Sequence, residues 1–431
     1  MLDVSAVDAA IDAGAERAFD FLSRLVAAPS TLGQEHSALA VFADEMGDLG
    51  FETRRVALDE DLADDPRAGV VQDVLGERYN LLGSMAADRP GPALLLNGHI
   101  DVVPAESTHR WTSPPFEPRR ADGRLYGRGA GDMKCGFAMG ALALRSLLAV
   151  APDALTGPLH FLAVIEEECT GNGTLAAARQ GVLADAVVLL EPTDLGVMVG
   201  GVGVLWCDVE IVGFSAHAQA AHLAVNPLDL AHRLVAGLRE WSGELAERFP
   251  DPELTDTDSP YNLNLGVTAA GDWPSSVPAE ALLRLRFGFP RAWTPVDAER
   301  EVRQAIATIV SEDGGFPAEP TARLSGFRAP GYLLERDHPL TTAMAEAHRD
   351  AHGADARIFS LGSTTDARIY LNHFDVPALC YGPAAADIHG IDESVELDSI
   401  VAGAKTLARF LARWYEAAPA EAAPAQAGRA G

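Results

Sequence analysis

Residues 93–101, which read ALLLNGHID, decide the fold class of this chain. The apolar run at 93–97 is short and is bounded by proline and glycine, a pattern typical of a buried strand. His99 and Asp101 follow at the carboxyl end of that strand, where α/β sheets bind their ligands. His99 can ligate a metal through one ring nitrogen while Asp101 holds the other. A loop histidine beside a solvated aspartate is the alternative.

Strands and helices alternate on both sides of this stretch. Further apolar runs predict buried strands, namely PLHFLAVI at 158–165, AVVLL at 186–190 and VPALCY at 376–381. Helical spacing of apolar residues predicts helices at 5–28, 36–49, 135–150, 339–352 and 395–415. Strands this apolar need cover on both faces, so the alternation predicts an α/β domain.

The pattern changes near residue 200. It predicts strands at 202–212, 261–268 and 280–289 and helices at 226–248 and 296–311. Strands and helices in this order are typical of an α+β unit inserted into the first domain. We therefore expect one domain at residues 1–200 and 327–431 and an inserted domain at 201–326. The Ala/Pro/Gly-rich tail at 418–431 is expected to be disordered.

Composition excludes several classes of protein. The chain has 431 residues, enough for two domains, and its net charge of −29 disfavours nucleic acid and anionic membranes as partners. We expect no signal peptide, and we expect no membrane span because no apolar run reaches the roughly 18 residues required. The four cysteines form no CxxC pair, which argues against a cysteine zinc site or a disulfide framework. We therefore expect a cytoplasmic location, in which these thiols stay reduced.

A glycine-rich turn precedes the helix predicted at 135–150. Residues 125–134 read LYGRGAGDMK, and glycines let the backbone turn tightly beside a site. Asp132 stands just before the helix, where its carboxylate can bridge two cations. Two alternatives stay open. Asp132 can simply cap the helix, or the loop can bind phosphate, although the spacing is not GxGxxG and no GK[ST] follows.

Acidic residues cluster after the strand predicted at 158–165. Residues 166–168 read EEE, and adjacent carboxylates in one cleft raise each other's pKa unless cations compensate. That arrangement suits one general base and one metal ligand. Glu191 follows the next predicted strand, and His389 lies late in the chain. Taken singly, each of these two is better explained as an ordinary loop residue than as a ligand.

Together these positions form a candidate metal site. Its ligands would be His99, Asp132, Glu168, Glu191 and His389. Histidine and carboxylate ligands without cysteine suit a catalytic zinc rather than a structural one. Two ions bridged by a carboxylate would lie about 3.5–4 Å apart and activate a water between them.

The motifs resemble those of the M20 metallopeptidase family. They are GHIDVVP at 98–104, YGRGAGDMK at 126–134, EEE at 166–168, EPT at 191–193 and IHG at 388–390. They occur in the family's order, and the resemblance covers about residues 15–412. It implies a Rossmann-like zinc-dependent exopeptidase domain with an inserted α+β lid and dimerisation domain. The family includes acetylornithine deacetylase, succinyl-diaminopimelate desuccinylase, aminoacylase and glutamate carboxypeptidase.

The resemblance also implies roles for the site residues. One zinc ion would be held by His99, Asp132 and Glu191, and the other by Asp132, Glu168 and His389. Asp101 would orient His99, and a cis peptide would follow Asp132. Glu167 would be the general base that takes a proton from water and passes it to the leaving amine. We expect two Zn²⁺ per chain, with cobalt or manganese as possible replacements.

The inserted domain carries further resemblance, in SAHA at 215–218 and HLAVNP at 222–227. In dimeric members the lid histidine reaches the partner's active site and helps to hold the oxyanion. That role would fall to His217 here, so we expect a homodimer. Asn226, in the second motif, is a candidate substrate contact.

Three more residues are candidate substrate contacts. Arg286 would bind a substrate carboxylate, and the alternative is an arginine that faces solvent on a strand. Ser363 and Thr364 lie in GSTTD at 362–366, which resembles the family's substrate loop; the alternative is a helix N-terminus. Ser275 replaces the asparagine of many members, which leaves the substrate contacts at that position open.

We therefore expect a cytoplasmic di-zinc amidohydrolase that removes an N-acyl group from a small amino acid or amine, like acetylornithine deacetylase. One alternative is an N-formyl-aminopyrimidine deformylase, since GDWPSSVPAE at 271–280 is similar to a subgroup that contains one. Another is a dipeptidase or carboxypeptidase of the same family. An alternative of another class, a non-catalytic binding protein that keeps the fold, is disfavoured because every expected ligand is present.

Overall fold

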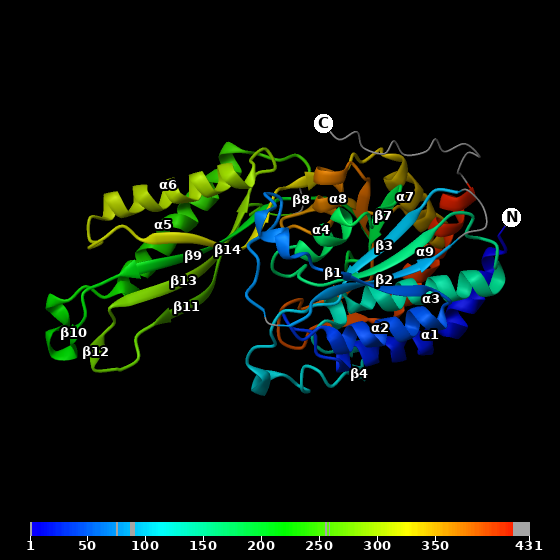
Figure 1. Ribbon diagram of the computed structural model, residues 1–431, viewed down its shortest axis with the longest axis horizontal. Coiled ribbons are helices and arrows are strands. Elements are labelled where there is room, and N and C mark those ends of the chain that lie inside the picture. Colours follow the sequence, from blue (N-terminus) through cyan, green and yellow to red (C-terminus); the bar gives the residue numbers. More distant parts are fainter. Residues whose placement is uncertain (1, 75, 87–90, 255–256, 258, 417–431) are drawn as a thin grey trace.

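The computed structural model describes residues 2–74, 76–86, 91–254, 257 and 259–416 (Figure 1). Within these residues the chain forms a large mixed sheet, which we call the main sheet, and a separate antiparallel sheet, which we call the second sheet. Short helical turns occupy Glu60–Asp64, Thr108–Arg110, Ala130–Lys134 and Ala218–Leu223. The tail expected to be disordered lies outside the described residues.

The main sheet has nine strands in the described part of the chain. They are β1 (Glu52–Ala57), β2 (Tyr79–Met85), β3 (Leu94–His99), β6 (Leu159–Val164), β7 (Ala186–Leu189), β8 (Val197–Gly201), β15 (Tyr332–Leu333), β16 (Ile358–Leu361) and β17 (Ala378–Cys380). Their order is β1–β2–β6–β3–β7–β17–β8–β15, and β16 pairs with β8. Strands β6, β3, β7 and β17 run parallel, so their carboxyl ends meet at one edge.

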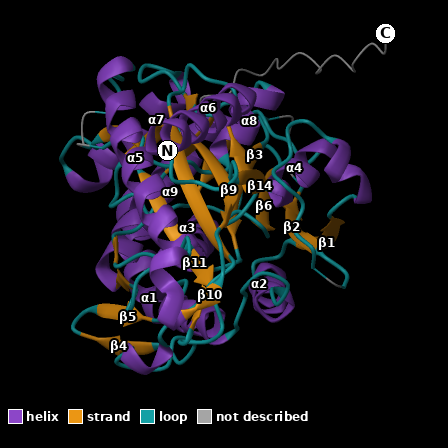
Figure 2. Ribbon diagram, turned by 90° about the vertical axis from the view of Figure 1, so that its left-hand side faces the viewer, coloured by secondary structure: helices purple, strands orange, loops and turns teal. Residues whose placement is uncertain are grey.

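Helices cover both faces of the main sheet, as strands this apolar require. They are α1 (Val4–Ala27), α2 (His36–Asp48), α3 (Cys135–Val150), α4 (Asn172–Arg179), α7 (Pro339–His352), α8 (Ala367–Phe374) and α9 (Leu397–Glu416). Leu94 and Leu96 of β3 pack in the core with α1, α2, α3, α7 and α9, whereas Leu95 packs with α4 and α8. In Figure 2 the helices (purple) flank the strands (orange). The α/β prediction is confirmed.

Helix α3 corrects one expectation from the sequence. The stretch Ala130–Val150 is long and apolar enough to cross a membrane by length and composition, with a mean hydropathy of 1.4. However, 78% of that window is buried inside the protein. Helix α3 packs against α1 and α9 beneath the main sheet, so its apolar surface is explained as core.

The second sheet is antiparallel and is built in the middle of the chain. Its strands are β9 (Gly203–Val212), β11 (Leu263–Ala270), β13 (Glu280–Phe289) and β14 (Thr321–Ala329), in the order β11–β13–β9–β14. Helices α5 (Pro227–Arg248) and α6 (Pro295–Asp313) pack on one face in a core of their own. A ribbon of β10 (Ala216–His217) and β12 (Ser276–Val277) forms the tip farthest from the main sheet (Figure 1).

A small third sheet brings two distant parts of the sequence together. Its strands are β4 (Arg119–Ala121), β5 (Arg124–Tyr126), β18 (Ala385–Ala386) and β19 (Ser394–Glu396), in the order β18–β19–β5–β4. Because β5 pairs with β19, the loop after Tyr126 lies beside the loop that ends at Ser394. These two loops carry Asp132 and His389.

Candidate metal centre

His99 is the last residue of β3 and is buried at the carboxyl edge of the main sheet. Its Nε2 lies 2.9 Å from Oδ1 of Asp132 and 3.9 Å from Oε2 of Glu191. Its Nδ1 lies 2.8 Å from the backbone carbonyl of Asp101, and since a carbonyl only accepts, Nδ1 carries the proton. In the neutral ring the Nε2 lone pair therefore faces two carboxylates. A cation between them would resolve this conflict.

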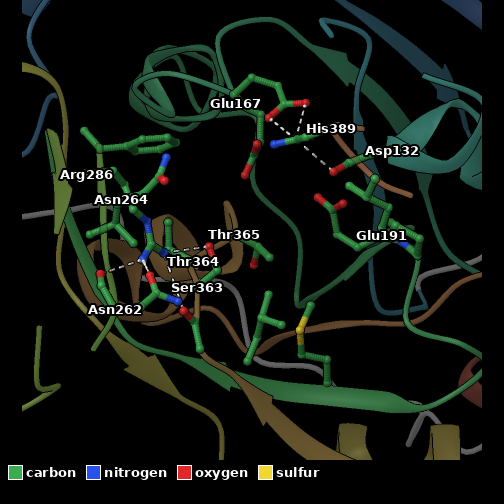
Figure 3. Close-up of a pocket in the computed structure, with 18 of the residues that line it drawn as sticks. Asp132, Glu167, Glu191, Asn262, Asn264, Arg286, Ser363, Thr364, Thr365 and His389 are labelled. Carbon is green, nitrogen blue, oxygen red and sulfur yellow. Dashed lines mark hydrogen bonds and ion pairs between the residues drawn. The ribbon is translucent and has the colours of Figure 1, made fainter. Parts of the chain in front are cut away.

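His389 forms the matching half of the cluster. Its Nε2 lies 3.0 Å from Oε2 of Glu168 and 3.4 Å from Oδ2 of Asp132. Asp132 thus turns one carboxylate oxygen toward each histidine. The ligand atoms of His99, Asp132 and Glu191 lie within 4.8 Å of one another, as do those of Asp132, Glu168 and His389. Figure 3 shows Asp132, Glu191 and His389 gathered at one end of a cavity.

The electrostatics of the cluster indicate an excess of buried negative charge. Burial raises the pKa of Glu191 to about 8 and that of Asp101 to about 7. Burial likewise raises the pKa of Glu167 well above its usual range, and His99 only partly opposes this. For His389, burial alone would lower the pKa, but hydrogen bonds to Asp132 and Glu168 raise it to about 11. Two divalent cations would supply the missing positive charge, so the residues present fit the metal pair.

Asp101 contacts His99 differently from the expectation. Its backbone carbonyl accepts from Nδ1, while its carboxylate Oδ1 lies 3.8 Å from that nitrogen. The carboxylate instead accepts backbone N–H groups of Glu167, at 3.3 Å, and Glu168, at 3.2 Å. One residue therefore fixes both the histidine ring and the turn that carries the two glutamates.

The turn that carries these glutamates begins with a strained residue. Glu166 has a φ of 64°, in the left-handed region that non-glycine residues seldom adopt. Its carboxylate pairs with Arg78 and accepts from the Thr170 hydroxyl at 2.6 Å. Arg78 also pairs with Glu35 at 3.0 Å. Sequence reasoning missed Arg78, because nothing near it in the chain marks its partners.

The cavity has a volume of about 590 Å³, and at the end opposite the metal cluster it is lined by residues of the second sheet and of the 362–366 loop (Figure 3). Arg286 on β13 donates to Oδ1 of Asn262 at 2.6 Å and to Oγ of Ser363 at 3.1 Å. Burial lowers the pKa of Arg286 to about 10, so the guanidinium stays charged at neutral pH. Thr364 also lines the cavity, and its buried Oγ1 has no hydrogen-bond partner among the described residues.

The cavity walls also contain residues that sequence reasoning did not single out. Asn262 and Asn264 line it, and their two-residue spacing at the start of β11 was a usable signal, since alternate residues of a strand share a face. Apolar side chains form another wall, and they are Met198, Val204, Trp206, Phe327, Phe359 and Leu361. Trp206 and Phe327 pack edge to face, with ring centroids 5.3 Å apart.

Two predicted site residues lie away from this cavity. Asn226 is the N-cap of α5 and accepts from the Leu228 N–H at 3.0 Å. His217 is exposed in the β10–β12 ribbon, where its Nδ1 accepts from the Gln219 N–H at 3.1 Å. Neither residue lines the cavity within this chain. The cis peptide implied after Asp132 is present, between Asp132 and Met133.

Comparison with known proteins agrees with this geometry. The profile of peptidase family M20/M25/M40 matches residues 95–413. The chain belongs to this family. It is 29% identical to succinyl-diaminopimelate desuccinylase of Paracoccus denitrificans over 407 residues, which are 91% of this chain and 97% of the relative. This chain is therefore a metal-dependent hydrolase that acts on amide bonds.

Two solved structures share the fold of this chain, an α/β domain with an inserted α+β unit. The dipeptidase Dug1p of Saccharomyces cerevisiae superposes with a TM-score of 0.79 at 16% identity, covering 96% of this chain and 99% of that one. A dinuclear metal-binding peptidase of the M20 family from Bacillus subtilis superposes with a TM-score of 0.59 at 15% identity, covering 94% and 99%. The fold class predicted from the sequence is confirmed.

Proposed function

We propose that this M20 hydrolase is a di-zinc deacylase that cleaves a free N-acyl amino acid into a carboxylic acid and an amino acid. The observation that carries the proposal is the shared carboxylate of Asp132, whose two oxygens face two separate sets of ligands. A bridging carboxylate between paired histidine and glutamate ligands is the donor arrangement of a two-metal hydrolytic site.

The two ligand sets would each hold one ion. His99, Asp132 and Glu191 would bind one, and Asp132, Glu168 and His389 would bind the other. The metal pair, when bound, supplies the Lewis acidity that lowers the pKa of a water and polarises the amide carbonyl. Zinc suits this mixture of imidazole and carboxylate, and cobalt or manganese can replace it.

Glu167 is proposed as the general base. It lines the cavity beside the ligands and is 8% exposed, so its carboxylate reaches substrate while remaining largely shielded from solvent. The Asp101 carboxylate fixes its backbone N–H. A raised carboxyl pKa moves the group toward the operating pH, where a base both accepts and returns a proton efficiently. Glu167 would therefore take a proton from the attacking water and deliver it to the leaving amine nitrogen.

Arg286 is proposed to bind the carboxylate of the amino-acid product. Among the described residues that line the cavity, it is the one with a permanent positive charge. Ser363 and Thr364 would add hydroxyl donors beside it. The apolar wall around Trp206 would take the uncharged remainder of the substrate. One cation facing an apolar wall favours a substrate with one carboxylate over a substrate with several.

We further propose that residues 201–326, which include most of the second sheet, form a lid and dimerisation domain set on a catalytic domain at 1–200 and 327–431. In a homodimer, His217 at the tip would reach the partner's cavity and help to hold the oxyanion. The exposure of His217, and the position of its strand β10 at the far tip of the second sheet in Figure 1, support a role outside its own subunit. The cytoplasm remains the predicted location.

The test combines metal content with a substrate panel. The panel holds N-acetyl, N-formyl and N-succinyl amino acids, dipeptides and a formyl-aminopyrimidine, each assayed before and after chelation. We expect about two metal ions per chain, as a bridged site requires, and chelator-sensitive hydrolysis of the N-acyl amino acids with one carboxylate. Turnover of dipeptides or the pyrimidine alone would replace the substrate assignment, and a chain that binds no metal would overturn the mechanism.

A further inference from the structure

Two loops of distant sequence are locked together beneath the proposed metal centre. The loop before α3 donates three backbone N–H groups to Glu393. The N–H of Gly127 bonds its backbone carbonyl at 2.9 Å, and those of Gly131 and Asp132 bond its Oε1, both at 2.9 Å. The backbone of the bridging ligand Asp132 is therefore held directly by one glutamate side chain.

Arg128 completes the connection in the opposite direction. Its guanidinium pairs with the second carboxylate oxygen of Glu393 and donates to the backbone carbonyls of His389, at 3.3 Å, and Gly390, at 3.2 Å. The Arg128 side chain is 3% exposed and that of Glu393 is fully buried. The Trp111 ring lies 5.2 Å from the guanidinium. We call the Arg128–Glu393 ion pair the clamp.

The loop that carries His389 needs such support. His389 has a φ of 63°, and Asp387 and Asp392 have φ values of 54° and 58°. Left-handed conformations of non-glycine residues cost free energy and persist only where surrounding contacts hold them. Asp392 is held by Thr112, whose N–H and hydroxyl donate to its carboxylate at 2.8 and 2.7 Å. The carbonyl of His389 is held by Arg128.

We infer that Arg128 and Glu393 are positioning residues that set the spacing between Asp132 and His389 and that they act unequally on the two metal sites. Glu393 holds Asp132, which both ligand sets share, so its loss affects both. The contact of Arg128 with the His389 carbonyl reaches only the site made by Asp132, Glu168 and His389. This inference rests on the proposed two-metal function.

Two substitutions separate these effects. Arg128→Lys keeps a positive charge opposite Glu393 but removes the planar fork that reaches three acceptors at once. Glu393→Gln keeps the side-chain length but replaces the charged acceptor of the Gly131 and Asp132 N–H groups by a weaker neutral one, and it removes the charge that pairs with Arg128. Metal-free protein would be titrated with Co²⁺ and followed by its visible absorption, which reports ligand geometry, with bound metal counted after gel filtration.

We expect wild type to bind two cobalt ions. Arg128→Lys should keep one site at wild-type affinity and weaken the other by roughly 10- to 100-fold, the usual effect of losing a residue that orients a metal ligand. Glu393→Gln should weaken both sites and change both absorption bands. If Glu393→Gln does not fold, the unequal loss in Arg128→Lys still decides the question.

Asp251→Asn is the matched control. Asp251 pairs with Arg291 in another largely buried ion pair, with side chains 9% and 16% exposed, and neither residue lines the cavity. This variant should lose stability yet bind both cobalt ions as wild type does. Wild-type affinities at both sites in Arg128→Lys, or equal losses at both, would overturn the inference. Wild-type protein that binds no cobalt would instead overturn the proposed metal centre, and the inference with it.

Discussion

The carboxyl edge of the main sheet and the tip of the second sheet differ in how complete they are within one chain. At the sheet edge, His99, Asp132 and Glu191 are buried or half-buried and contact one another. At the tip, His217 is exposed, and among the described residues its ring accepts only from the backbone N–H of Gln219. A cluster whose ligand atoms are already gathered is ready to bind metal, whereas the proposed role of the exposed histidine requires a partner subunit. The predictions below test this contrast.

The largest effect is expected from Glu167→Gln at the sheet edge. Removing the base should lower kcat by roughly 10²- to 10⁴-fold, because proton transfer then depends on water alone. Metal content should stay at the wild-type value, since Glu167 belongs to neither ligand set. Steady-state kinetics and metal analysis of the same preparation would check both. Glu280→Gln, at an exposed position on β13, is the control and should be unaltered. Retained turnover in Glu167→Gln would refute the assignment.

The second largest effect is expected at the tip. His217→Ala should lower kcat by roughly 10²-fold, the usual cost of losing one oxyanion donor, with metal content unchanged. His222→Ala, five residues away and also exposed, is the matched control and should behave as wild type. An unaltered kcat in His217→Ala would refute the proposed oxyanion role of His217.

Mixing variants decides whether His217 acts in its own subunit or in the partner. A heterodimer of Glu167→Gln and His217→Ala chains has one intact site only if His217 crosses between subunits. Random exchange of subunits between equal amounts of the two variants should then restore about a quarter of wild-type activity in a symmetric dimer. If His217 serves its own subunit, no heterodimer site is intact and mixing restores nothing. Sedimentation of each variant would verify that dimers form.

A smaller effect is expected where the cavity meets the second sheet. Arg286→Met should raise KM for an N-acyl amino acid by roughly tenfold or more, because a charge-assisted hydrogen bond contributes about 1.5–3 kcal/mol. The matching N-acyl amino-acid amide lacks the carboxylate, so wild type and variant should differ little on it. Arg284→Met is the control, two residues away on the same strand, exposed and outside the cavity lining. An equal increase in KM for both substrates would show that Arg286 does not bind the substrate carboxylate.

The contrast between the two regions also explains what could be predicted from the sequence. Three of the predicted ligands lie at or shortly after the ends of apolar strands, and they are His99, Glu168 and Glu191. Because an apolar run marks its strand in the sequence, the same pattern located the strand end and the ligand that follows it. Strand β14 was missed, because its sequence TARLSGFRA is broken by Ser325 and Gly326 and its pairing with β9 shifts register there. Strand β1 was missed because four of its six residues are charged or polar and exposed.

The clamp was missed for a different reason. Arg128 and Glu393 are 265 residues apart, and a buried ion pair leaves no periodic signal in either segment. Asp101 shows a similar limit. Its spacing from His99 predicted a contact between the two residues, but the choice between carboxylate and backbone carbonyl depends on the turn that carries Glu167. Sequence patterns locate the strand ends, whereas the contacts between loops come from tertiary structure.

The smallest effect is expected in the pH dependence of stability, and it sharpens the picture of the sheet edge. Burial raises the pKa of Glu191 to about 8 and of Asp101 to about 7, well above the values near 4 of an unfolded chain. Between about pH 4 and 8 the folded, metal-free protein therefore holds protons that the unfolded chain has already released, so its stability falls as the pH rises through this window. The titration of His389 also makes the stability of the fold decrease as the pH rises. Its raised pKa stabilises the fold fully below about 6.5, and that contribution is lost as the pH rises toward its folded pKa.

Zinc should reverse this dependence, because the ligands bind metal only when deprotonated and release protons as they do so. The increase in Tm on adding zinc should therefore grow between pH 6 and 8, by a few degrees. Thermal melts with and without zinc at each pH would measure it. Glu191→Gln removes one titrating ligand and should flatten the metal-free profile. A zinc-induced shift that stayed constant or shrank with rising pH would mean that the metal does not displace protons from this cluster, and the buried carboxylates at the sheet edge would need another explanation.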